Sequence, residues 1–186
     1  MRKALIILIG ILASSVAFGQ IAFRGGINYS NVNIDGVSTI ETDSKIGFHA
    51  GLQGNIAIGN VLAVRPALLY NIKGAKVTTN GADQSSALHY VEVPLNLGFR
   101  LGAGPIALIL EGGPYYGYLV NTSDGLFNDI GKSDWGANFG AIIELDDIGI
   151  GVNYSNGLND IEKEDQIGQA FKLQNGNLAV FAYFKF

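Results

Sequence analysis

The sequence predicts an all-β fold: an eight-stranded, antiparallel, up-and-down transmembrane β-barrel with short periplasmic turns and four longer extracellular loops. The first observation is the final segment, 172–186, whose second half alternates apolar and mixed positions and stops on Phe186. An open sheet would leave this apolar strand edge unpaired, whereas a closed barrel pairs its last strand with its first. The other two observations are connections that alternate between long and short, and charged strand residues that share one face.

Residues 1–19 have the pattern of a secretory signal peptide, which leaves residues 20–186 as the outer-membrane β-barrel domain. Two basic residues precede an apolar core at 4–13, and the small-x-small motif at 17–19 predicts cleavage before Gln20. An uncleaved membrane anchor is the alternative, but a spanning helix needs about 20 apolar residues and this core is shorter. We therefore expect export to the bacterial outer membrane.

The composition excludes several classes of function. Hydrophobic residues make up 48% of the chain and charged residues only 15%, with 26 glycines. Signal-peptide removal takes two of the 12 basic residues and leaves 16 acidic ones, so the mature net charge is −6. We expect no nucleic-acid partner, because no basic surface is available to neutralise phosphates. Zero cysteines exclude a disulfide framework.

Each predicted strand alternates between an apolar and a more polar face, as side chains on a β-strand do. The strands are expected at 21–31, 45–58, 61–74, 88–101, 106–120, 134–145, 148–155 and 172–186. In chain order, their apolar faces include Phe23, Leu52, Leu68, Leu97, Leu108, Ile143, Ile150 and Val180. Their opposite faces include Asn28, Gln53, Asn71, Asn96, Glu111, Asn138, Asn153 and Asn177.

Turn-forming and polar residues separate these strands. Short turns are predicted at 59–60, 102–105 and 146–147, where glycine, asparagine, proline and aspartate favour tight reversals. Longer polar loops are predicted at 32–44, 75–87, 121–133 and 156–171. Short turns at the periplasmic rim, longer loops outside and an even strand number are typical of outer-membrane barrels.

Three prolines fall inside predicted strands: Pro66, Pro94 and Pro114. Proline has no backbone N–H to donate, and a closed barrel has no edge where this loss is harmless. We therefore expect local bulges, or ladder ends that face the lumen, at these positions.

A soluble eight-stranded barrel of the lipocalin type is the main structural alternative. Its polar face would meet water and should carry about 25–35% charged residues. Here that face is largely Gly, Ala and Asn, while Tyr29, Trp135 and Phe184 lie near the ends of apolar faces, as in the aromatic girdles of membrane barrels. The membrane barrel is therefore favoured.

The charged residues of the polar faces predict an ionic network inside the barrel. Its expected members are Arg24, Arg65, Arg100, Glu92, Glu111 and Glu144, and Lys73 and Lys185 share the same face. An interior enclosed by eight strands holds little more than side chains, so we expect these charges to plug the lumen. An unpaired buried charge costs several kcal/mol, which favours pairing with or without a function. A gated ion path, in which the pairs rearrange, is the functional alternative.

Several segments resemble the PorT-like outer-membrane β-barrel family. They are GGINYSN (25–31), VRPALLYNIKGAK (64–76), LHYVEVPLNLGFR (88–100), EGGPYYGYLV (111–120), GANFGAIIEL (136–145) and GVNYSNGLNDI (151–161). The most specific feature is a P-x-L-x-Y-x-x-K-G segment followed by Y-x-E-V-P-L. The resemblance implies an eight-stranded barrel in a Gram-negative outer membrane. The founding member of the family is linked to a protein-secretion system, a role that family-level similarity does not transfer.

No catalytic, cofactor-binding or metal site is expected. His49 and His89 lie on different predicted strands without companion ligands, whereas a zinc site needs three or four. Some small barrels modify lipids with Ser and His at the outer rim, and Ser85 and Ser86 near His89 only imitate that arrangement.

The expected partners follow from the expected location. They are outer-membrane lipid, lipopolysaccharide, and the barrel-assembly machinery, which would read the C-terminal strand ending at Phe186. Acidic residues crowd the last loop, where divalent ions could bridge them to lipopolysaccharide: Asp160, Glu162, Glu164 and Asp165.

The sequence thus predicts a non-enzymatic integral outer-membrane protein with a filled lumen and a structural or loop-mediated interaction role. One alternative is a narrow channel or transporter for small solutes. A second is a lipid-modifying enzyme, and a third is an accessory to secretion across the outer membrane, with envelope or secretion proteins as partners.

Overall fold

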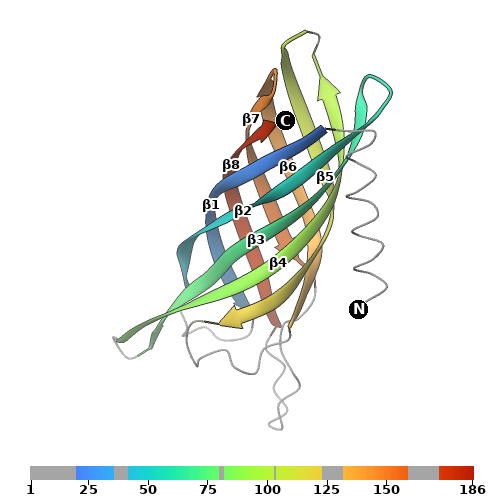
Figure 1. Ribbon diagram of the computed structural model, residues 1–186. Coiled ribbons are helices and arrows are strands. Elements are labelled where there is room, and N and C mark those ends of the chain that lie inside the picture. Colours follow the sequence, from blue (N-terminus) through green and yellow to red (C-terminus); the bar gives the residue numbers. More distant parts are fainter. Residues whose placement is uncertain (1–19, 36–41, 80–81, 103, 123–131, 159–171) are drawn as a thin grey trace.

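The computed structural model describes residues 20–35, 42–79, 82–102, 104–122, 132–158 and 172–186, and these residues form one closed barrel. Its eight strands are β1 (Gln20–Asp35), β2 (Thr42–Ile58), β3 (Leu62–Thr79), β4 (Ala82–Leu101), β5 (Ile106–Thr122), β6 (Ser133–Leu145), β7 (Ile148–Gly157) and β8 (Lys172–Lys185). Every strand pairs antiparallel with its sequence neighbours, and the tilted strands form a narrow cylinder (Figure 1). The predicted fold class is confirmed. Among the described residues, no helix is long and apolar enough to cross a membrane.

The pairing of β1 with β8 closes the barrel. Their ladder runs from Ala22 opposite Lys185 to Asp35 opposite Lys172. At the end of the chain, the backbone N–H of Phe186 donates to the carbonyl oxygen of Ile21 at 2.9 Å. The apolar edge of the last strand, which suggested a closed sheet from sequence alone, is therefore satisfied by backbone hydrogen bonds.

The two faces of the wall separate by chemistry in the predicted way. Apolar side chains point outward and are largely exposed, as at Ile27 (62%), Phe139 (65%) and Ile143 (64%). Inward-facing neighbours such as Asn28 and Asn138 are buried. Side chains alternate across a strand, so one sheet can present lipid-compatible residues outside and polar residues inside.

The strands extend further than predicted at the end opposite the short turns. β3 and β4 continue their ladder as far as the pair Thr79–Ala82, so most of the loop predicted at 75–87 is strand. Likewise β1 reaches Asp35 and β2 begins at Thr42, inside the loop predicted at 32–44. The polar composition of these segments suggested loops, but the backbone hydrogen bonds of a ladder do not depend on apolar side chains.

Bulges or ladder ends were expected at the three prolines. The prediction of bulges is wrong, but the β3–β4 ladder is interrupted at Pro94 and the β4–β5 ladder opposite Pro114. Pairing passes from Pro66–Leu95 to Leu69–Glu92 and from Pro94–Tyr115 to Leu97–Gly112 without a change of register. Pro114 pairs with Ala137 within a continuous ladder. The register instead shifts between Ser44 and His49 on β2 and between His89 and Tyr90 on β4. A proline thus removes a donor without inserting a residue, and the face pattern continues beyond it.

Inward-facing glycines allow close approach of neighbouring strands. A Cβ added to Gly51, between His49 and Gln53, would lie 2.0 Å from the carbonyl oxygen of Leu68. At Gly113 on β5, an added Cβ would lie 2.1 Å from the carbonyl oxygen of Leu95. No side chain fits at such distances, so these glycines permit the tight curvature of a narrow barrel.

We predict that Gly51→Ala destabilises the folded barrel by about 1–3 kcal/mol, because the added methyl group must displace the β3 backbone. Urea titration in detergent micelles, followed by the fluorescence of the single tryptophan, Trp135, measures this change. Gly25→Ala is the matched control, since its added Cβ meets nothing closer than 3.7 Å on the outer face. Equal stability of the two variants would contradict the role assigned to Gly51.

Candidate functional site

The ion pairs of the lumen fall into three charge centres, the first and third of which both contact Tyr183. The first is built around Glu111 on β5. Its Oε2 lies 2.9 Å from Nε of Arg65, and its Oε1 lies 3.6 Å from Nη1 of Arg24. Arg24 also donates to Oε1 of Gln53 at 3.1 Å and stacks over the ring of Phe181 at 3.5 Å. Two cations thus hold one carboxylate in the interior of the barrel.

The second centre has the opposite composition, with one cation between two carboxylates. Nζ of Lys73 lies 2.8 Å from Oε2 of Glu92 and 3.3 Å from Oδ2 of Asp134. The hydroxyl of Tyr115 donates to Oδ1 of Asp134 at 3.2 Å. The Lys73 ammonium also lies 4.8 Å from the ring centre of Tyr115, within the range of a cation–π interaction.

The third centre lies beside the short turns and is built around Glu144 on β6. Arg100 and the hydroxyl of Tyr183 both donate to its carboxylate, and Nζ of Lys185 lies 3.2 Å from Oε1. The side chain of Arg100 is 34% exposed, whereas that of Glu144 is 3% exposed. This centre is therefore the one that a solute entering from the short-turn end would meet first.

A chain of hydrogen bonds extends the second centre across the barrel. Nδ1 of His49 lies 2.7 Å from Oδ1 of Asn28, and Nδ2 of Asn28 donates to Asn71. Asn71 donates in turn to Glu92 at 3.1 Å. Polar side chains from β1, β2, β3 and β4 are thereby joined at one level, which fixes the side chains that fill the lumen there.

The six residues proposed from sequence all lie on the inner face, but they do not form one cluster. Arg24 and Arg65 meet Glu111, Arg100 meets Glu144, and Glu92 belongs to the centre of Lys73. Asp134, which pairs with Lys73, was not among the predicted members of the network. Alternation along the strand could have identified Asp134, because it shares the inner face of β6 with Asn138 and Glu144.

Aromatic side chains also fill the lumen, although the inner face was predicted to be largely Gly, Ala and Asn. The buried members are Tyr90, Tyr115, Phe181 and Tyr183. Their positions on the inner face could be read from the alternation along each strand, but the prediction stressed the small and polar residues of that face. Large rings between the charge centres leave less room for water, and a lower local dielectric strengthens the ion pairs.

The two histidines lie on opposite sides of the wall. His49 is buried inside, whereas Nδ1 of His89 lies 2.8 Å from the exposed hydroxyl of Tyr70 on β3. Within the described residues, no group of three or more His, Cys, Asp or Glu side chains is arranged to hold a metal ion. The acidic residues expected to bridge to lipopolysaccharide, at 160–165, lie outside the described residues.

We predict that Lys73→Met destabilises the barrel by about 3–5 kcal/mol, because Glu92 and Asp134 then face each other without a cation. Adding Glu92→Gln should recover part of this loss by removing one of the two buried carboxylates. Urea titration in micelles measures both variants. A stability equal to wild type for Lys73→Met would show that the pairing does not hold the lumen together.

Comparisons with known proteins agree with the barrel fold. A family model described as "Outer membrane protein beta-barrel domain" matches residues 17–163. The solved structure of OprG from Pseudomonas aeruginosa is 13% identical, with 91% of this chain and 96% of that chain covered and a TM-score of 0.57. Neisserial surface protein A, NspA, is 13% identical, with 89% and 97% covered and a TM-score of 0.52.

Ail, the attachment invasion locus protein of Yersinia pestis, is 16% identical, with 91% of this chain and 99% of that chain covered and a TM-score of 0.50. None of the curated proteins compared with the chain matches it. At these identities the structural neighbours support the fold alone. The family match, which covers most of the chain, supports more: this protein belongs to the outer-membrane β-barrel domain family.

Proposed function

We propose that the protein is a non-enzymatic component of the outer membrane whose lumen is sealed by its own side chains and whose contacts are made by its loops and outer wall. The observation that carries the proposal is the set of three charge centres, which occupy the interior at successive levels. Side chains from at least two strands meet at each level. A body of this kind supports a structural or loop-mediated role better than the passage of solutes.

A narrow channel is the alternative, in which the ion pairs would exchange partners to open a path. The burial of the second centre argues against it, because the side chains of Lys73, Glu92 and Asp134 are 1%, 6% and 0% exposed. Breaking such a pair leaves an uncompensated charge in the interior, which costs several kcal/mol. An open state would therefore be rarely populated.

The orientation, processing and finer family assignment are parts of the same proposal. We infer cleavage before Gln20, which the intact mass of protein purified from outer membranes tests. In the proposed orientation the short turns face the periplasm, and the barrel-assembly machinery reads the strand that ends at Phe186.

The PorT-like assignment rests on the sequence segments that resemble this family. An accessory role in secretion would be supported by co-purification with periplasmic secretion proteins.

Single-channel recording tests the sealed lumen. We predict that the mature protein, refolded in detergent and inserted into planar lipid bilayers, produces no stable conductance steps in potassium chloride. A general diffusion porin refolded and inserted in the same way is the positive control, and retention of the folded form on unheated gels confirms that the inserted protein is native. Stable, large conductance steps from the folded protein would contradict the proposal and favour the channel.

A further inference from the structure

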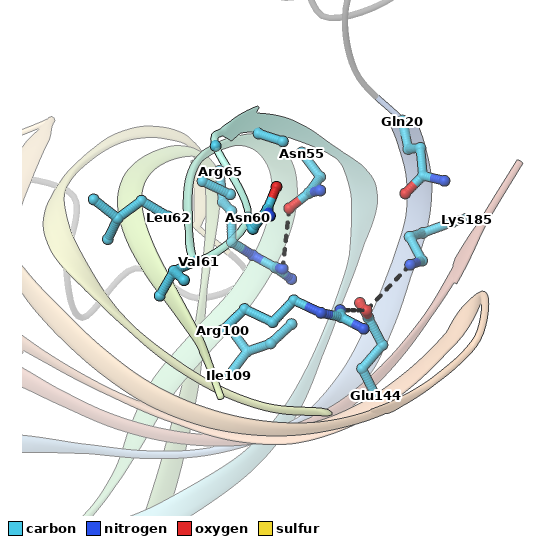
Figure 2. A pocket seen from close by; sticks show the side chains of 13 residues that line it. Gln20, Asn55, Asn60, Val61, Leu62, Arg65, Arg100, Ile109, Glu144 and Lys185 are labelled. Carbon is cyan, nitrogen blue, oxygen red and sulfur yellow. Dashed lines mark hydrogen bonds and ion pairs between the residues drawn. The ribbon is translucent and has the colours of Figure 1, made fainter. Parts of the chain in front are cut away.

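The lumen is hollow at the end that carries the short turns. A pocket of about 270 Å³ lies there, between the turn that joins β2 to β3 and the inner faces of the neighbouring strands. Its polar lining includes Asn55, Asn60, Arg65, Arg100, Glu144 and Lys185 (Figure 2). The side chains of Arg65, Arg100 and Lys185 converge on this space, as Figure 2 shows.

The charge of the pocket is positive. Its lining contains three cationic side chains, Arg65, Arg100 and Lys185, and one carboxylate, Glu144. Glu144 already accepts hydrogen bonds from Arg100 and Tyr183 and lies 3.2 Å from the Lys185 ammonium. Behind the pocket Glu111 pairs with Arg65 but also with Arg24, so two carboxylates face four cations in all. This excess of positive charge attracts anions from solution.

Arg65 brings a further positive charge to the inner end of the pocket. Arg65 is only 3% exposed, and its Nε faces Glu111 at 2.9 Å while its Nη1 donates to Asn55 at 3.3 Å. Within the described part of the chain, Nη2 of Arg65 has no hydrogen-bond partner. Nη2 is also closed off from the pocket, so Arg65 contributes its positive charge there, while the more exposed Arg100 supplies hydrogen-bond donors at the mouth.

We propose that this pocket binds a small anion through its phosphate or other oxyanion group, with Arg65 at the inner end and Arg100 and Lys185 at the mouth. Guanidinium groups present paired donors that match the oxygens of such a group. The volume exceeds that of a single phosphate, so a small phosphorylated solute would fit. Because the charged lining faces the lumen and not the lipid, a free solute is favoured over a phospholipid headgroup.

The test is titration calorimetry of the full mature protein in uncharged detergent, with inorganic phosphate as the probe at constant ionic strength. Wild-type protein should bind phosphate saturably. Arg100→Gln should weaken binding about tenfold, since a hydrogen bond to a charged group contributes at least that factor. Asn60→Asp, a change in an exposed turn, should also weaken binding, and it preserves the test if Arg100→Gln fails to fold.

Lys132→Gln is the matched control, because it removes the same charge from an exposed position at the opposite end of the barrel. It should bind phosphate like wild type. A second titration with monomeric short-chain phosphatidylglycerol separates the two sources of the phosphate group: binding of this lipid alone, with the same dependence on Arg100, would overturn the free-solute assignment. Binding of neither probe, or equal losses in Lys132→Gln and Arg100→Gln, would overturn the site itself.

Discussion

The constraint on which the structure depends is closure of the backbone ladder between β1 and β8. In lipid, an unsatisfied backbone N–H or C=O costs several kcal/mol, so a sheet can cross the membrane only when no edge remains. The pairs from Ala22–Lys185 to Asp35–Lys172 remove that edge. Once the sheet is closed, alternation along each strand divides the side chains into an apolar outer surface and a confined inner one.

Confinement explains the charge arrangement. Beyond the pocket at the short turns, side chains fill the lumen and leave no room for bulk water, so each buried charge needs a partner from another strand. The Glu111 and Glu144 centres each place two cations around one carboxylate, whereas the Lys73 centre places two carboxylates around one cation. The positive excess lies nearer the short turns, where the lumen is hollow, and the negative excess lies further along the strands.

The sequence was sufficient for the fold and for the inner or outer position of the charges, because a period of two residues is a local property of each strand. Partner choice is not local: Arg100 and Glu144 lie 44 residues apart and meet only through the register of β4, β5 and β6. Asp134 was missed because it stands at the start of a predicted strand. The strand that continues beyond residue 74 was predicted to be a loop, because its residues are polar, yet polar residues can continue a ladder. Bulges were wrongly expected at the prolines, because losing a backbone donor does not require an inserted residue.

The central claim is that apolar side chains face lipid while the paired charges fill a water-poor interior. Spin labelling tests it directly, since the chain has no cysteine and single cysteines can be placed freely. In lipid bilayers, labels at Ile27, Ile143 and Val180 should collide often with oxygen and rarely with a water-soluble nickel complex. A label at the adjacent inward residue Ala179 should collide rarely with both. Frequent nickel collisions at the outward positions, or at Ala179, would contradict the account.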